Sequence, residues 1–170
     1  MITRRILCFA GAGMSLLGAA NARAEPFSKP TGKPILTISG RIGVTNVGET
    51  VVLDREMLEG IGMTSFRTMT PWYTEPVVFE GVLMTTLMQR VQAKGETLVV
   101  TALNDYTSDI PIADFARFQP IIALKRNGAY MEVRDKGPLF IVYPYDSRPE
   151  LRSQLFYSRS PWQVARMDIR

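Results

Sequence analysis

The stretch IIALKRNGAYMEVRDKGPLFIVYP (residues 121–144) decides the fold class. It begins with two β-type runs, residues 121–126 and 129–133, separated by Asn127-Gly128. This dipeptide supplies the positive φ angles of a type I′ turn, so an antiparallel hairpin is predicted. The stretch ends in a strongly apolar run, residues 139–143, which predicts a buried strand.

The rest of the chain alternates short β-type runs with a few helical segments. We expect strands at residues 35–40, 50–53, 65–70, 76–79, 97–102, 106–110 and 163–169. We expect helices at residues 55–59, 82–94, 111–115 and 150–155. The whole pattern predicts an α+β fold of mixed, mostly antiparallel short strands with two or three helices.

The strongest helical signal contains a stripe of methionine and aliphatic residues. Leu83, Leu87 and Val91 recur at i, i+4 and i+8, and Met84 and Met88 lie on the adjoining flank. Methionine fills irregular gaps in apolar packing. We therefore expect this stripe to lie in the core rather than to bind a ligand.

The first 24 residues have the organisation of a secretory signal peptide. Arg4 and Arg5 form a positive start, residues 6–20 are apolar, and Ala22-Arg23-Ala24 is a small-x-small cleavage site. We expect cleavage after Ala24 and a periplasmic mature chain without a transmembrane segment. The paired arginines leave general secretion and twin-arginine export both open.

The mature chain is expected to consist of a lead-in and one domain. Residues 25–34 are rich in Pro, Lys and Gly and predict a flexible lead-in, and residues 35–170 form the single domain. Three of the 20 basic residues lie in the signal, which leaves 17 against 16 acidic residues. This near-neutral balance argues against a nucleic-acid partner.

Histidine and cysteine are missing from the working part of the chain. The sequence has no histidine, and its one cysteine, Cys8, lies in the signal. Ser-His-Asp and Cys-His catalysis are therefore excluded, as are ordinary zinc, haem and iron–sulfur sites.

The order of the segments resembles a known family. The segments are ILTISGRIG (35–43), TVVLDREMLEGIG (50–62), PVVFEGVLMTTLMQRV (76–91), LVVTALNDYTSDIPIADF (98–115), the stretch at 121–144 and SRSPWQVARMDI (158–169). Together they resemble the molybdopterin-binding catalytic domain of the sulfite oxidase family, in its small exported bacterial form. The resemblance implies a mixed α+β domain whose molybdenum is held by a pterin dithiolene and one protein cysteine. Members of that family transfer oxygen atoms or reduce oxidised sulfur groups.

The chain departs from this family at the positions that hold the cofactor. The resemblance places Thr68 nearest the position of the molybdenum-binding cysteine, and a threonine hydroxyl is a poor ligand for a soft metal. After the strand LFIVYP the family commonly has an aromatic residue and a lysine, whereas this chain has Tyr145 and Asp146. Arg159 remains as a basic residue in the closing segment. We therefore expect no bound cofactor, although the resemblance keeps molybdopterin open.

The candidate site residues are those placed near the family's cofactor cleft, together with nearby polar and aromatic residues. They could stack on a small anionic ligand or pair with its charge. For Asn104 turn chemistry is the competing interpretation, and for the arginines a solvated surface position is. The candidates are Arg67, Thr68, Trp72, Tyr73, Asn104, Tyr145, Arg148 and Arg159.

Three functions remain open at this point. The first is a non-catalytic, exported binding, sensory or accessory module that has lost the metal and binds a small anionic ligand or a membrane or periplasmic protein. The second is a genuine molybdopterin-dependent oxidoreductase that holds the cofactor without a protein thiolate. The third is a structural subunit of a redox complex. Fold alone does not choose between them.

Overall fold

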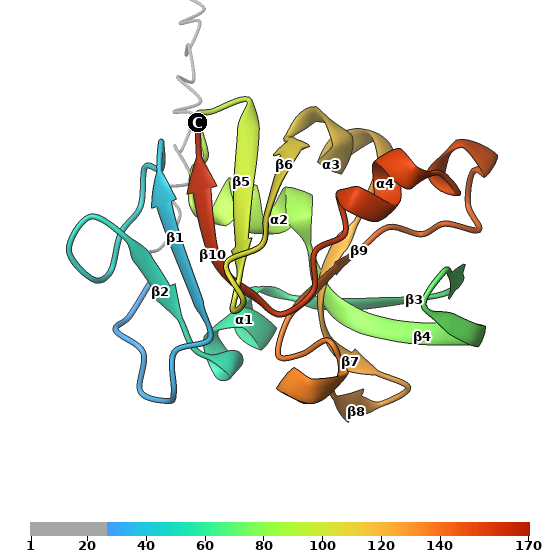
Figure 1. Cartoon of the computed structure of the whole chain (residues 1–170). Helices are drawn as coiled ribbons and strands as arrows, with labels where there is room; N and C mark the ends of the chain where they lie inside the picture. The colour runs from blue at the N-terminus through green and yellow to red at the C-terminus, as the bar shows by residue number, and fades with distance from the viewer. Residues whose placement is uncertain (1–26) are drawn as a thin grey trace, which may run out of the picture.

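The computed structural model describes residues 27–170 of the 170-residue chain. The signal peptide expected at residues 1–24, with its cleavage site, lies outside the described residues. Two β-sheets lie side by side, and short helices lie around and between them (Figure 1). The strands are β1 (Leu36–Gly40), β2 (Val51–Leu53), β3 (Met63–Thr70), β4 (Tyr73–Leu83), β5 (Thr97–Ala102), β6 (Thr107–Pro111), β7 (Ile121–Arg126), β8 (Ala129–Tyr130), β9 (Phe140–Val142) and β10 (Val164–Ile169).

The first sheet has the order β2-β1-β10-β5-β6. Strands β1 and β10 pair in parallel, and all other pairs are antiparallel. The last strand of the chain thus lies in the middle of this sheet. Its central strands are largely covered: Ile38, Val100 and Met167 are fully buried, and β5 has three consecutive buried residues, Leu98 to Val100.

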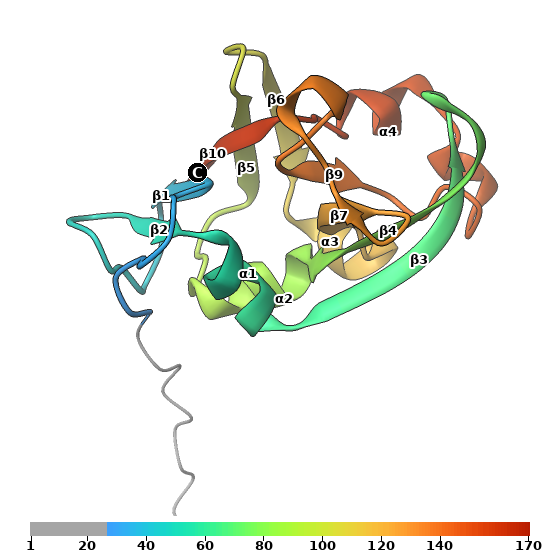
Figure 2. The ribbon, with the colours of Figure 1, turned by 90° about the horizontal axis from the view of Figure 1, so that it is seen from below.

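The second sheet has the order β3-β4-β7-β8, with β9 paired to β7, and contains the hairpin predicted at Asn127-Gly128. Both turn residues have positive φ, 49° and 82°, as a type I′ turn requires. Seen from below, β3 and β4 form a long curved ribbon along one side of the molecule (Figure 2). The ladder is irregular at Glu80/Gly81, where a Cβ on Gly81 would overlap the carbonyl oxygen of Ile122.

The helices are short. They are α1 (Arg55–Ile61), α2 (Met84–Arg90), α3 (Ala113–Phe118) and α4 (Gln154–Ser158), with 3-10 turns at Val133–Asp135 and Pro149–Leu151. The described residues thus contain four α-helices rather than two or three, within an α+β fold of mostly antiparallel strands, as expected. Helices α1 and α2 pack against each other and both contact β4 (Figure 2).

Several boundaries differ from the predicted ones because strand pairing overrides the helical pattern. The helix predicted at 82–94 begins only at Met84, since Val82 and Leu83 pair with β7, and it ends at Arg90 before Gln92 adopts positive φ. The helix predicted at 150–155 divides into the second 3-10 turn and α4. Met84 and Met88 are buried, so the prediction that the methionine stripe belongs to the core is confirmed.

One hydrophobic cluster joins the two sheets. It contains Ile38 and Val100 from the first sheet and Phe79, Ile122 and Ile141 from the second. The segment expected to be a flexible lead-in is held to this body, because Asp54 Oδ2 accepts hydrogen bonds from the amides of Thr31 (3.0 Å) and Gly32 (2.8 Å).

Candidate functional site

A pocket of about 360 Å³ opens where turns from both sheets meet α4. The turn between β3 and β4 contributes Pro71 and Trp72, and the end of β5 with the turn after it contributes Ala102, Asn104 and Tyr106. Helix α4 and the segment that leads to β10 contribute the rest of the lining, Gln154, Tyr157, Ser158, Ser160, Pro161 and Trp162. The fold therefore brings together three segments that are distant in the sequence.

Trp72 is the fixed centre of the aromatic wall. Its ring makes edge-to-face contacts with Tyr157 and Trp162, at centroid distances of 6.0 and 5.6 Å, and with the buried rings of Phe140 and Tyr145, at 5.2 and 6.1 Å. Such pairs stabilise a defined ring orientation. The pocket therefore has a preformed wall.

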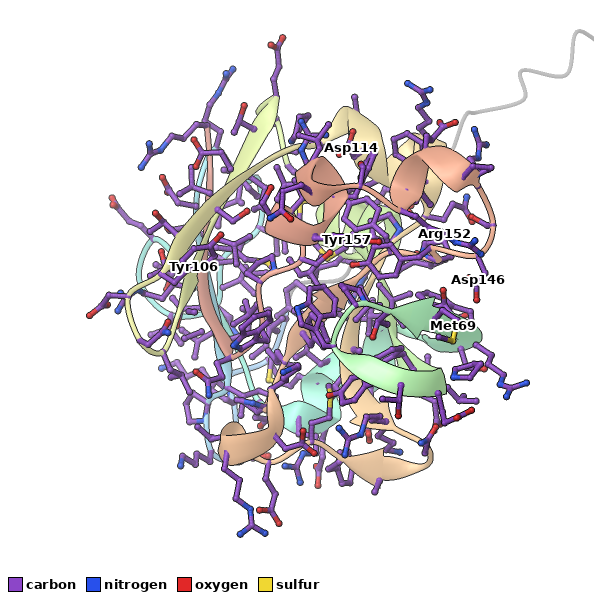
Figure 3. The ribbon with its side chains drawn as sticks, turned by 45° about the vertical axis from the view of Figure 1, so that its right-hand side comes forward. Met69, Tyr106, Asp114, Asp146, Arg152 and Tyr157 are labelled. Carbon is purple, nitrogen blue, oxygen red and sulfur yellow. The ribbon has the colours of Figure 1, made fainter. Side chains whose placement is uncertain are left out.

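The other aromatic side chains of the pocket come from different elements. Tyr106 lies in the turn after β5 and Tyr157 lies on α4 (Figure 3). Tyr106 and Trp162 line the pocket and are 49% and 37% exposed, so both rings also reach solvent at the pocket mouth. The sequence analysis did not include Tyr106, Tyr157 and Trp162 among the site residues. The available signal was an aromatic residue next to a predicted turn, as at Tyr106 after Asn104-Asp105.

The polar lining consists of amides and hydroxyls. None of the eleven lining residues has a charged side chain. Asn104 Oδ1 accepts the backbone N–H of Tyr106 (3.2 Å), which fixes the amide within its turn. Ser160 Oγ lies 2.5 Å from the hydroxyl of Tyr145, a fully buried candidate residue behind the pocket wall. Burial raises the pKa of this tyrosine above its ordinary value.

Thr68 belongs to a small hydrogen-bonded cluster, which we call the Thr68 cluster. Its members are Thr68, Met69, Asp146 and Arg152. Thr68 is 1% exposed; its hydroxyl donates to the Met69 carbonyl (3.1 Å) and accepts the Asp146 amide N–H (3.1 Å). The Asp146 carboxylate accepts the Met69 amide (2.7 Å) and pairs with Arg152 (2.6 Å), and these three residues lie together in Figure 3. The Met69 amide, followed by Arg152, keeps the pKa of Asp146 below its usual value.

Arg159 directly follows α4 and stands between the lining residues Ser158 and Ser160, but it is not part of the lining itself. Its guanidinium pairs with Asp114 (2.8 Å), whose Oδ2 also accepts the Tyr143 hydroxyl (3.1 Å). The side chains of Arg159 and Asp114 are only 20% and 12% exposed. Arg159 is therefore already paired.

The remaining candidates also lie outside the lining. Arg67 is exposed on β3, and Arg148 is exposed with its guanidinium 5.6 Å from the Phe118 ring centroid. Tyr73 packs under Arg126, whose guanidinium lies 4.7 Å from the ring centroid. Of the eight predicted residues, the pocket thus brings together Trp72 and Asn104, while Tyr145 supports it through Ser160.

The fold is similar to one already known. The structure matches the crystal structure of the sulfane dehydrogenase SoxCD from Paracoccus pantotrophus with a TM-score of 0.60 and 17% identity, over 79% of this chain and 37% of that one. The chain therefore spans less than half the length of that protein. No protein-family model and no curated protein matches the sequence. At this identity the similarity shows the fold alone, and the expected sulfite oxidase-like α+β fold is in agreement with it.

The residues present do not fit the molybdenum cofactor that the family resemblance implies. The residue that the resemblance places nearest the cysteine position is a buried threonine whose hydroxyl is already hydrogen-bonded, and a hydroxyl is a poor ligand for a soft metal. Where the resemblance expects a lysine, the chain has Asp146, whose carboxylate is already paired with Arg152. Within residues 27–170, no group of three or more Cys, Asp or Glu side chains is arranged to hold a metal ion. No helix in that range is long and apolar enough to cross a membrane.

Proposed function

We propose that this protein is a non-catalytic binding module of the periplasm that takes a small molecule into the pocket beside Trp72. The observation that carries the proposal is the pocket itself. It is concave, it is of the size used for small ligands, and it combines aromatic walls with a few amides and hydroxyls. We infer export from the signal-peptide pattern of residues 1–24. A module that binds a small molecule without catalysing a reaction would have a sensory or accessory role.

The ligand class differs from the small anion that the sequence suggests. A small anion is held most strongly by cationic donors, but Arg67, Arg148 and Arg159 do not line the pocket, and the amides and hydroxyls that do line it carry no charge. Arg159 is held by Asp114. We therefore propose a ligand without net negative charge, bound through its apolar faces.

The Thr68 cluster supports a role other than molybdenum chemistry. Binding the family's cofactor would require the Thr68 and Asp146 hydrogen bonds to break and a carboxylate to face an anion. Fold similarity to a sulfane dehydrogenase supplies no activity by itself. Natively exported protein is therefore expected to contain far less than one molybdenum atom per chain, and stoichiometric molybdenum with pterin fluorescence would overturn the proposal.

The chain contains a built-in reporter for binding. Both of its tryptophans, Trp72 and Trp162, line the pocket. Small molecules that enter the pocket should therefore change the intrinsic tryptophan fluorescence in a saturable manner. A screen of uncharged, cationic and anionic metabolites measures this directly, with calorimetry to confirm stoichiometry.

A matched pair of variants separates pocket binding from surface binding. Ser158→Trp narrows the pocket from an exposed position on α4 and should abolish binding, whereas Ser153→Trp, just before α4 and outside the lining, should leave it unchanged. Equal affinity in both variants, or no saturable ligand in the whole screen, would contradict the pocket as the binding site.

A further inference from the structure

The pocket has the composition of an aromatic cage. Two tryptophans and two tyrosines line it, namely Trp72, Trp162, Tyr106 and Tyr157. Aromatic faces carry negative electrostatic potential, so several faces around one cavity attract a cation even when no carboxylate is present. An uncharged ligand lacks this charge-dependent attraction, and an anion is repelled by the ring faces.

The geometry of the walls agrees with such a cage. The Trp72 ring is inclined by 70° to Tyr157 and by 77° to Trp162, with centroids 6.0 and 5.6 Å apart. Both pairs are edge-to-face contacts, so the rings meet at an angle and form corners instead of a flat stack. Trp72 is thus placed as the common wall of two such corners.

The charge distribution selects the kind of cation. No lining residue is acidic, so a primary ammonium would lose its water without gaining a carboxylate partner. A quaternary ammonium carries its charge on methyl groups, has no N–H to satisfy and is weakly hydrated. The amides of Asn104 and Gln154 remain for a polar tail on the same molecule.

We propose that the pocket binds a quaternary ammonium compound through cation–π contacts with its four aromatic walls. This inference rests on the proposed binding function and names its ligand class. The cage itself comes from the turn between β3 and β4, the turn after β5, and α4 with the segment that follows it.

Lys136 offers an independent probe of ligand charge. Its ammonium lies 4.6 Å from the Trp162 ring centroid but is not part of the pocket lining. Removing this like charge from beside Trp162 should tighten binding of a cation by about two- to threefold at low salt. The same change should leave a neutral ligand unaffected and weaken an anion.

The experiment compares choline with 3,3-dimethyl-1-butanol, its uncharged isostere, by tryptophan fluorescence and calorimetry on the purified protein. Choline should bind about tenfold more tightly, which corresponds to about 1.4 kcal/mol. Sodium chloride at equal ionic strength controls for salt. The Lys136→Gln variant should increase the affinity for choline alone.

Substitutions at the pocket mouth supply a matched series. Tyr106 is half exposed, so its replacement should leave folding intact. Tyr106→Phe keeps the ring and should bind choline within twofold of the original protein, whereas Tyr106→Leu should lose about two- to fivefold.

The outcomes separate this inference from the proposed function. Equal affinity for choline and its isostere, or binding that Tyr106→Leu and Lys136→Gln leave unchanged, would overturn the cation proposal while keeping a ligand-binding pocket. Failure of choline to bind would also overturn it. The proposed function falls if the wider metabolite screen finds no ligand that the Ser158→Trp variant loses, or if the exported protein contains stoichiometric molybdenum with pterin fluorescence.

Discussion

At the scale of single residues, Arg159 tests whether an arginine binds the ligand, as the sequence predicted, or only stabilises the fold. Arg159→Met would leave Asp114 as a buried carboxylate that retains only the Tyr143 hydroxyl. We expect this change to lower the free energy of unfolding by about 2 kcal/mol, because a buried charge would lose its partner. Ligand affinity should stay within twofold, since Arg159 does not line the pocket.

Urea unfolding and fluorescence titration of the same variant measure the two quantities separately. Arg117→Met is the matched control, because Arg117 forms an exposed pair with Glu150 and its loss should cost less than about 0.5 kcal/mol. A tenfold loss of affinity in Arg159→Met with unchanged stability would restore the arginine to the binding site, as the sequence predicted.

The Thr68 cluster shows which features of single residues could be predicted from the sequence and which could not. The missing cysteine at Thr68 and the acid at Asp146 are visible in the sequence. That these two departures contact each other is not, because they are 78 residues apart and only the fold joins them. Similarly, Trp72 and Asn104 were predicted as site residues, but the turns that add Tyr106 and Trp162 meet only in three dimensions.

At the scale of secondary-structure elements, Asp54 ties α1 to the segment before β1. One carboxylate oxygen caps α1 through the Met57 amide (3.0 Å), and the other accepts the amides of Thr31 and Gly32. The Met57 and Gly32 amides lower the pKa of this carboxyl. Asp54→Ala should therefore lower the free energy of unfolding by about 2 kcal/mol at pH 7.

The pH dependence of this contribution has a definite sign. Because the folded pKa of Asp54 lies below the unfolded value of about 3.9, its stabilisation is fully present above that value and is lost as pH falls through the folded pKa. The stability difference between the original protein and Asp54→Asn, measured by urea unfolding from pH 7 to pH 2.5, should shrink at the acidic end. A constant difference would show that the charge contributes nothing.

Elements with strong local patterns were predicted most closely. Strands β5 and β7 occupy the predicted residues 97–102 and 121–126, since apolar runs and the Asn127-Gly128 turn define them locally. The start of the helix that begins at Met84 was predicted two residues too early, at residue 82. Nothing in the helical periodicity reveals that Val82 and Leu83 pair with β7. Tertiary pairing, rather than propensity, sets that boundary.

At the scale of the whole molecule, the pocket connects the two sheets. Trp72 follows β3 of the second sheet, Tyr106 precedes β6 of the first, and Trp162 lies in the segment that returns the chain to β10. This segment is itself joined to both sides, since the Gln163 carbonyl accepts the Leu103 amide (2.8 Å) and the Gln163 amide donates to the Lys136 carbonyl (3.1 Å). A bound molecule should therefore restrain parts of both sheets together.

Hydrogen exchange at amides measures this coupling. With choline at a saturating concentration, exchange should slow by about threefold or more in the peptides that cover residues 69–74, 103–107 and 162–164, because local opening of any one turn must release the ligand. The amides of α1, which contributes no residue to the lining, should change least. Protection confined to one turn would mean that the ligand sits on a single sheet, and the pocket would then not be the element that joins the two.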